Sequence, residues 1–407
     1  MKTILASAYA INPYKGSEDG MGWNFIYQIA RFNKVIAITR ENNRPHIESY
    51  MKEKPDFIYE NITFLYFDLP YILRFWKKGT FTAMIYFYLW QRFLPSFVRK
   101  QKLQFDIVHN VNFHNDWTPS HLWKLNKPFV WGPVGHHPVI PQQYLQLYEK
   151  KYIYKERVTW LIKKMFWSLS SDLKRTSQNA VHVLCMNKSV PSRLNLQPKK
   201  YSIIPSVATE DNGFKQNKSN DKFTFISAGR LVPLKGFDLT IQAFSKFLYA
   251  QTETDRKKCE LIIVGSGPEA DTYKNMVKKL EIEKNVKFIE WINREDLMNL
   301  FSNANVFLFP SHEGAGMVVA EALSFGLPVV CLDNCGPGEF IDENCGITVS
   351  YTNYNQSIHE LSIALKKLFS TPDLLKKMST NARKHFEVNF NWDVRGEQFR
   401  KIYSNLN

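Results

Sequence analysis

Short apolar runs alternate with longer amphipathic stretches along the whole chain, and this alternation predicts the secondary structure. The runs that read as buried strands cover residues 3–9, 34–39, 62–67, 107–111, 129–132, 181–185, 223–228, 259–264, 286–289, 306–309, 328–332 and 346–349. Strands that alternate with helices are typical of parallel sheets covered by helices on both faces. Two successive series of this kind predict an α/β protein with two Rossmann-like domains.

A polar segment, "PSVATEDNGFKQNKSNDK" at residues 205–222, separates the two series and is the predicted linker. A chain of 407 residues also exceeds what one hydrophobic core usually organises. We therefore expect an N-terminal domain over 1–205 and a C-terminal domain over 206–391. Ligands of such sheets bind at the carboxyl ends of the strands, in the cleft of a two-domain chain.

Composition narrows the class of protein. Hydrophobic residues make up 44% and charged residues 22%, as in soluble globular proteins. Five cysteines without regular spacing form neither a disulfide framework nor a zinc site, so a reducing cytoplasm is expected. The net charge of +15 suits nucleic acid, an acidic membrane surface or a phosphorylated substrate. No nucleic-acid-binding motif is present, so nucleic acid is not an expected partner.

Two segments interleave aromatic and basic residues. The first covers residues 71–100. The second is "VTWLIKKMFWSL" at 158–169, which places five apolar residues on one helical face: Leu161, Ile162, Met165, Phe166 and Leu169. Helices of this kind can lie on an anionic membrane. Core-facing helices with solvated lysines explain the pattern equally well, and both interpretations stay open.

"SAGRLVPLKGF" places Arg230 and Lys235 just past the strand predicted at 223–228. Two cations at a strand end facing a cleft suit a diphosphate, because arginine offers a fork of donors and lysine a point charge. A solvated pair of surface charges is the alternative.

"VGSGPEA" has the spacing Gly265-x-Gly267-x-x-Ala270 between a strand and a helix, and Glu290 follows about 20 residues later. This outline of a dinucleotide fingerprint is the best argument for an NAD-dependent dehydrogenase. Two features weaken it: an earlier strand precedes the motif in its domain, and Pro268 lacks an amide that would face a pyrophosphate.

"SHEGAGMVVAEAL" predicts a short loop followed by a helix. Gly314 and Gly316 allow close approach of a ligand, and amides near Met317 would face an anion. Glu313 and Glu321 would repel a phosphate, so they fit neutral hydroxyls of a sugar and a ribose. Alternatively, the two residues are an ordinary capping carboxylate, Glu313, and a solvated acid on the helix, Glu321.

Taken together, these motifs resemble glycosyltransferase family 4, whose members are retaining enzymes of the two-domain GT-B fold. The resemblance rests on the Glu313-x7-Glu321 spacing, "ALSFGLPVV", "GRLVPLKGFDLTIQAF" and "VGSGPE", and is strongest over 225–350. "NPYKGSEDGMGWN" and "VHNVNFHNDWTPSHLW" resemble parts of the N-terminal domain of bacterial surface-polysaccharide members more loosely. A final helix over 392–407 resembles one that joins that domain.

The resemblance implies roles for matching residues. Arg230 and Lys235 would bind the donor's diphosphate, Glu313 the hydroxyls of the transferred sugar and Glu321 the ribose. The implied donor contacts also include Gly314, Ala315, Gly316, Met317 and Ile292.

In the N-terminal half, Gly16 would approach the phosphates. A histidine near the donor sugar is typical of the family, with His114 the first choice and His109 the second. Departures from the family pattern are Ala315 between the two glycines, Ser17 after Gly16, the sequence at 205–207, and Glu290–Trp291 near the expected base.

The implied reaction moves a hexose or N-acetylhexosamine from a nucleotide-sugar, with UDP favoured over GDP, to a saccharide acceptor, lipid-linked in surface polysaccharide synthesis. The chain contains no Asp-x-Asp sequence, so no metal and no other cofactor is expected. The expected location is cytoplasmic, with an anionic inner-membrane face as a further candidate partner. A GT-B-like nucleotide-sugar isomerase and a nucleotide-binding partner subunit remain alternatives.

Overall fold

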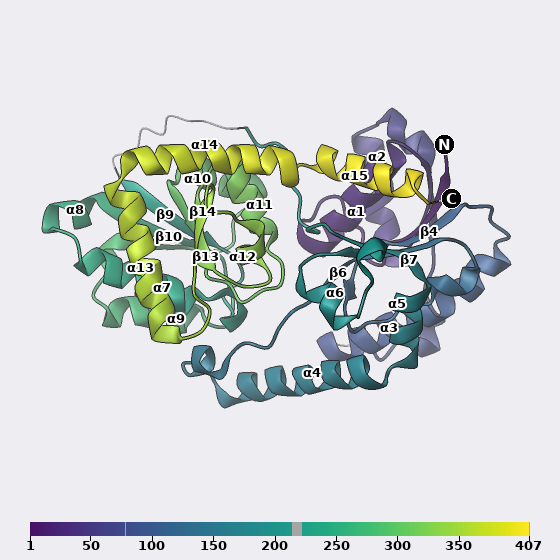
Figure 1. The fold of residues 1–407 in the computed structure, drawn as a ribbon, viewed down its shortest axis with the longest axis horizontal. Coiled ribbons are helices and arrows are strands. Elements are labelled where there is room, and N and C mark those ends of the chain that lie inside the picture. The colour runs from purple at the N-terminus through teal and green to yellow at the C-terminus, as the bar shows by residue number, and fades with distance from the viewer. Residues whose placement is uncertain (78, 214–221, 407) are drawn as a thin grey trace. The chain divides into compact units, whose positions relative to one another are not determined.

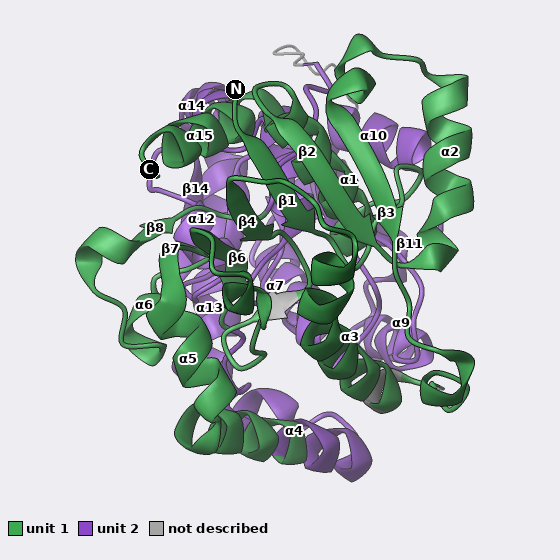
Figure 2. Ribbon diagram, turned by 90° about the vertical axis from the view of Figure 1, so that its right-hand side faces the viewer, with its two compact units in different colours: residues 1–136, 158–206, 392–407 green, residues 137–157, 207–391 purple. Residues whose placement is uncertain are grey.

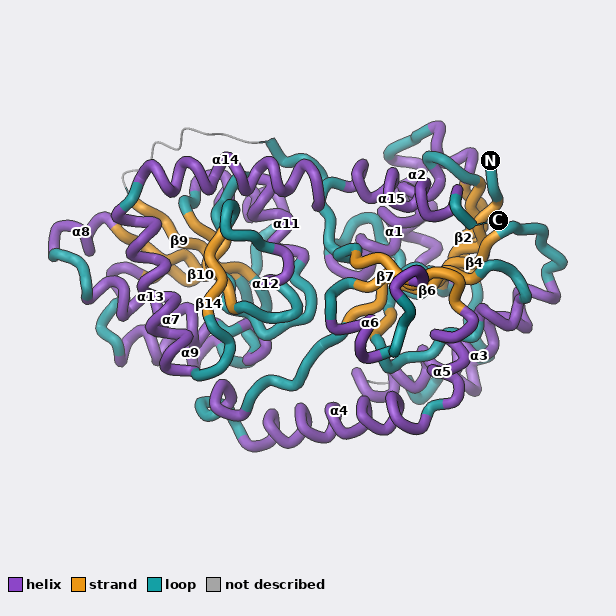
Figure 3. Tube along the Cα trace, in the orientation of Figure 1, coloured by secondary structure: helices purple, strands orange, loops and turns teal. Residues whose placement is uncertain are grey.

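The computed structural model describes residues 1–77, 79–213 and 222–406. The chain divides into two compact units (Figure 2). Unit 1 comprises residues 1–136, 158–206 and 392–407, and unit 2 comprises residues 137–157 and 207–391. In each unit the strands lie together and helices cover them (Figures 1 and 3).

Unit 1 contains a parallel sheet of order β3-β2-β1-β4-β6-β7-β8, with β5 paired to β6. Its strands are β1 (Thr3–Ser7), β2 (Lys34–Thr39), β3 (Ile62–Tyr66), β4 (Ile107–Asn110), β5 (His114–Asn115), β6 (Phe129–Gly135), β7 (Ala180–Cys185) and β8 (Tyr201–Ile203). The apolar run at the N-terminus is therefore an interior strand of this sheet, between β2 and β4.

The helices of unit 1 include the C-terminal one. They are α1 (Ser17–Ala30), α2 (Arg44–Glu53), α3 (Thr80–Lys100), α5 (Ser171–Asn179), α6 (Ser189–Arg193) and α15 (Trp392–Ser404). The ring of Phe25 on α1 contacts Trp392 and Phe399 of α15, with centroids 5.4 and 5.3 Å apart. These aromatic contacts attach the last helix to the first.

Unit 2 contains a parallel sheet of order β11-β10-β9-β12-β13-β14, the order of a doubly wound Rossmann sheet. Its strands are β9 (Phe223–Ala228), β10 (Cys259–Val264), β11 (Val286–Ile289), β12 (Val306–Leu308), β13 (Val329–Leu332) and β14 (Gly346–Val349). Its helices are α7 (Phe237–Tyr249), α8 (Glu253–Lys258), α9 (Ala270–Lys279), α10 (Arg294–Asn303), α11 (Met317–Ser324), α12 (Pro337–Phe340), α13 (Tyr354–Ser370) and α14 (Pro372–Asn389).

All twelve predicted strands are confirmed, and the structure adds β5 and β8. Those two strands are two and three residues long, too short for an alternating pattern to stand out. The predicted class, an α/β protein with two Rossmann-like domains, is confirmed.

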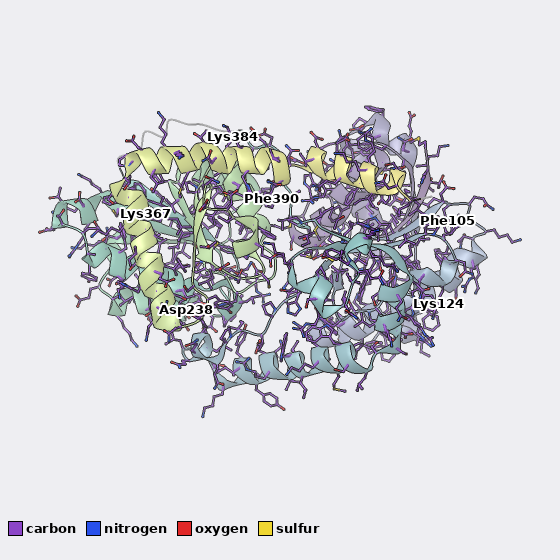
Figure 4. All side chains as sticks on the ribbon, viewed as in Figure 1. Phe105, Lys124, Asp238, Lys367, Lys384 and Phe390 are labelled. Atoms are coloured by element: carbon purple, nitrogen blue, oxygen red, sulfur yellow. The ribbon has the colours of Figure 1, made fainter. Side chains whose placement is uncertain are left out.

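The predicted domain ranges are wrong for residues 137–157, which pack with unit 2. The Tyr148 hydroxyl donates to Asp238 at 2.7 Å (Asp238 is labelled in Figure 4), and the Tyr144 ring contacts Tyr351 and Tyr354. Burial raises the pKa of Asp238. Of the predicted linker, residues 214–221 lie outside the described part of the chain, whereas Val207 and Thr209 are buried in unit 2.

Burial distinguishes the two aromatic-basic segments. Helix α3 faces the core of unit 1 through Tyr86, Trp90 and Leu94, which are almost fully buried. No residue of α4 (Lys150–Leu169) is buried. The core interpretation therefore holds for α3, and α4 keeps an exposed apolar face.

Candidate functional site

The loops that follow β9 and β12 bring a lysine and a glutamate together in unit 2. The Lys235 ammonium lies 2.7 Å from Oε2 of Glu313, and each side chain is only 18% exposed. Lys235 ends a short helical turn that closes at Gly236, whose φ of +67° favours glycine. A Cβ at Gly236 would also lie 2.1 Å from the Pro310 carbonyl oxygen, so this close approach of the two loops requires glycine.

The loop that carries Glu313 is fixed by its neighbours. The Asn334 side chain donates to the Ser311 carbonyl at 2.6 Å, and the Ser311 hydroxyl lies 3.3 Å from the Glu313 carboxylate. A Cβ at Gly336 would lie 2.0 Å from the Glu313 carbonyl oxygen. The loop leads into α11, whose first-turn amides have no acceptor within the helix. The ion pair of Lys235 and Glu313 thus lies near the N-terminus of α11.

Glu321 lies further along α11 and has a different partner. It is buried, and the Arg294 guanidinium contacts its carboxylate and also donates to the Thr209 hydroxyl at 3.1 Å. Arg294 begins α10, after β11. No motif in the sequence marks this arginine, because one exposed cation on a helix is common and its partner lies 27 positions away.

A pocket of about 500 Å³ opens at the carboxyl ends of β9, β10 and β11. Arg230, Trp291 and Ile292 are among the residues that line it. The Arg230 side chain is exposed and makes no hydrogen bond or ion pair with another described residue. Of the two predicted phosphate-binding cations, Lys235 therefore has an internal counterion and Arg230 is available to a ligand.

The glycines of "VGSGPEA" are explained by packing. A Cβ at Gly265 would lie 1.9 Å from the Gly229 carbonyl oxygen, and one at Gly267 would lie 2.3 Å from that of Leu231. The Leu231 amide donates to the Ser266 carbonyl at 2.9 Å. The loops after β9 and β10 contact each other through these glycines. Packing therefore explains the glycine spacing without a bound dinucleotide, and the argument for a dehydrogenase loses its support.

In unit 1, Gly16 is the N-cap of α1, and a Cβ there would meet nothing within 4 Å. Ser17, where family members have a second glycine, adopts φ +57°, a conformation that glycine favours. The backbone of His114 forms β5, while its side chain is outside what the structure describes. The site candidates of unit 1 thus lie in the loops after β1 and β4.

His109 is wrong as a donor-facing candidate. It is fully buried, with Nδ1 2.6 Å from the Tyr403 hydroxyl and Nε2 2.7 Å from the Gly132 carbonyl oxygen. Burial lowers the pKa of this histidine to about 4. Both ring nitrogens are thus used inside unit 1.

Another histidine, His137, was not predicted and reaches the loop of interest. Its Nδ1 accepts a hydrogen bond from the Gly314 amide at 3.2 Å. His137 lies in the segment that sequence reasoning assigned to the first domain. Only the packing of that segment on unit 2 shows that it belongs beside Glu313.

Residues 208–385 match the family model described as glycosyl transferases group 1. A mannosyltransferase of Corynebacterium glutamicum, named as GDP-mannose-dependent and acting on monoacylated phosphatidylinositol monomannoside, is 29% identical over 181 residues, 42% of this chain and 45% of that protein. An uncharacterized glycosyltransferase of Haemophilus influenzae is 32% identical over 191 residues, 45% of this chain and 50% of that protein. The chain therefore spans about half the length of the curated relatives it matches.

Solved structures resemble the whole chain. HepE of Anabaena in complex with UDP and glucose aligns over 100% of both chains, with 13% identity and a TM-score of 0.62. WaaG, a glycosyltransferase involved in lipopolysaccharide biosynthesis, aligns over 99% of this chain and 100% of its own, with 17% identity and a TM-score of 0.62. At such identities the likeness shows the fold alone, which is that of GT-B glycosyltransferases.

Proposed function

We propose that the protein is a retaining glycosyltransferase that moves a hexose or N-acetylhexosamine from a nucleotide-sugar to a saccharide acceptor. The observation that carries the proposal is the contact between Lys235 and Glu313 beside the N-terminus of α11. It lies within the 178 residues, 208–385, that match the glycosyltransferase model. A site for a glycosyl donor needs a cation that stabilises the leaving phosphate and an acid that binds the sugar hydroxyls.

Binding of the donor would redistribute these charges. The diphosphate would take Lys235 and Arg230 as cations, with the first amides of α11 as further donors. Glu313 would then be released toward sugar hydroxyls, and Glu321, beside Arg294, would hold the ribose. The pocket that Ile292 lines would receive the base. We favour uracil, as part of a UDP-sugar.

The chemical step needs stabilisation of the leaving diphosphate rather than a metal clamp. Preorganised cations and amides act on the charge that develops at the phosphate. We propose a front-face route in which a donor phosphate oxygen takes the acceptor proton, with Glu313 positioning the sugar. A nucleophilic role for Glu313, as in glycosidases that retain configuration, is the less favoured route because the second carboxylate of that scheme, Glu321, is assigned to the ribose.

A donor screen that follows nucleotide release tests the function directly. UDP- and GDP-sugars are both included, since the Corynebacterium relative is named for GDP-mannose. Activity that survives the double change Glu313→Ala and Lys235→Ala would overturn the assignment, and activity abolished by EDTA would overturn metal independence. If the donor is isomerised when no acceptor is present, the protein is an isomerase. If the nucleotide binds tightly but is not turned over, the protein is a nucleotide-binding partner subunit.

The acceptor we propose is lipid-linked, at the inner face of a membrane in surface polysaccharide synthesis. None of the described helices is both long and apolar enough to cross a membrane. On α4, however, Tyr154, Val158, Leu161, Met165 and Leu169 follow helical spacing along one face and are between 37% and 76% exposed. We call these five residues the α4 stripe.

Basic residues flank the α4 stripe on both sides. At 100° per residue, Lys151 and Lys155 lie along one edge and Lys150 and Lys164 along the other, all of them exposed. An apolar stripe between two rows of lysines fits an anionic lipid surface, where the stripe enters the headgroup region.

Flotation with vesicles tests this placement. The protein should float with phosphatidylglycerol vesicles, and Leu161→Glu with Met165→Glu should weaken binding at least about tenfold, because two apolar side chains become charged. Ile363→Glu, an exposed change on α13, should leave flotation intact. A protein that stays at the bottom, or an α4 stripe that only mediates self-association in sedimentation without lipid, would overturn the placement.

A further inference from the structure

Glu18 is a partly buried acid that the proposed donor chemistry does not use. It lies in the first turn of α1, directly after Gly16 and Ser17, at the carboxyl end of β1. Its Oε2 accepts a hydrogen bond from the Phe113 amide at 3.3 Å. Phe113 lies between β4 and β5, immediately before His114. The carboxylate therefore links the start of α1 to the segment that carries the predicted catalytic histidine.

Asn112 makes a parallel link between the same two loops. Its side-chain amide donates to the Ala10 carbonyl at 2.7 Å and to the Glu18 carbonyl at 3.1 Å. The approach leaves no room for a side chain at Gly22 of α1, where a Cβ would lie 2.0 Å from the Ala10 carbonyl oxygen and 2.5 Å from Asn112 Nδ2. Glu18 and Asn112 together hold the loop after β4 against the loop after β1.

Both ends of the Glu18 link have unusual backbone conformations. Ser17 has φ +57° and Phe113 has φ +67°, values in the left-handed region that non-glycine residues rarely adopt. Such conformations persist only where the surrounding contacts impose them, and they cluster at functional sites. The Phe113 ring packs on Tyr9 and Phe87, with centroids 5.0 and 5.1 Å apart, and this packing holds the residue from the other side.

An acid is a costly choice for this link. Burial raises the pKa of Glu18 to about 7, and the charge of Asp19 adds to the rise, while the Phe113 amide lowers it. A neutral glutamine could accept the same hydrogen bond without the desolvation of a carboxylate. An acid with a raised pKa in the loop region at the ligand-binding edge of a parallel sheet is a candidate functional residue.

We propose that Glu18 is a positioning residue of the transfer reaction: its carboxylate fixes the Phe113 amide and thereby the backbone of His114. The inference rests on the proposed function, because it assigns a purpose to His114 within that reaction. It adds an acid to the site candidates of unit 1, Gly16 and His114.

The experiment compares Glu18→Ala and Glu18→Gln with Asp19→Asn, the neighbouring acid, as a matched control. We expect Glu18→Ala to lower kcat about tenfold with less than a twofold change in donor KM, and Glu18→Gln to recover activity to within about threefold of wild type. Amide hydrogen exchange over residues 111–116 should become faster in Glu18→Ala and stay near wild type in Glu18→Gln. The thermal midpoint of Glu18→Gln at pH 8 should rise by a few degrees, because a partly buried charge is removed.

The outcomes separate the inference from the function on which it rests. A wild-type protein without transferase activity overturns the proposed function, and the exchange data then still report whether Glu18 holds the loop. Wild-type kcat in Glu18→Ala, or unchanged exchange over 111–116, overturns the positioning role while leaving the transferase assignment intact. A loss of activity that follows the loss of folded protein in both variants would also overturn it.

Discussion

The candidate site residues of the two units have different kinds of partner at the carboxyl ends of the central strands. Unit 2 pairs them: Lys235 with Glu313, and Arg294 with Glu321. In unit 1, the partly buried Glu18 accepts from a backbone amide and His109 lies between a hydroxyl and a carbonyl, while the buried Asp116 carboxylate lies 2.6 Å from Nδ1 of His136. A charged ligand can take the place of one partner of an ion pair, whereas a group with neutral partners has no counterion to exchange. The contrast predicts that the paired residues of unit 2 meet the charged end of the donor.

The largest effect should come from Lys235. Lys235→Ala should lower kcat/KM about a hundredfold, because the leaving diphosphate loses a cation, and Lys246→Ala on the exposed face of α7 should change little. Exchanging the pair, as Lys235→Glu with Glu313→Lys, restores an ion pair of reversed polarity. Steady-state kinetics on the exchanged variant would contradict the proposed roles if activity returned, since only a purely structural pair tolerates the swap.

A smaller effect is expected from the second pair in unit 2. Arg294→Ala leaves Glu321 buried without its cation, which should raise the donor KM about fivefold while kcat changes less than twofold. Arg294→Lys keeps the charge but not the fork that also reaches Thr209, so it should fall between wild type and alanine. A fall in kcat with unchanged KM would place Glu321 at the reacting centre instead of at the ribose.

The smallest effect on catalysis should come from unit 1's buried histidine. His109→Gln should keep activity within about twofold at pH 7.5, because both ring nitrogens are engaged away from any ligand. The folded pKa of His109, about 4, lies below its ordinary value of 6.5, so its contribution to stability is complete above pH 6.5 and is lost as the pH falls toward 4. Thermal midpoints from pH 7.5 to 4.5 should therefore fall less steeply in His109→Gln than in wild type. A parallel slope would contradict the burial of a neutral imidazole.

Much of unit 2's site was predictable because its motifs are local. Arg230, Lys235, Glu313 and Glu321 were each predicted as site residues from their place after a strand or within a helix, and the glycines from the turns they occupy. Their pairing was not predictable: Lys235 and Glu313 are 78 positions apart, and Arg294 carried no signal of its own. The choice between His109 and His114 likewise needed the α15 hydroxyl of Tyr403, which lies 294 positions from His109.

By itself, the sequence determined the parallel α/β architecture, the twelve principal strands and the loops that carry the candidate residues, because strand and helix periodicities are local properties of the chain. Only the tertiary structure decided that residues 137–157 pack with unit 2, that α3 is core while α4 keeps its stripe exposed, and that Ser17 adopts a conformation usual for glycine. The reason is physical: burial, pairing and backbone strain are set by atoms that come from distant segments, and no window along the chain contains them.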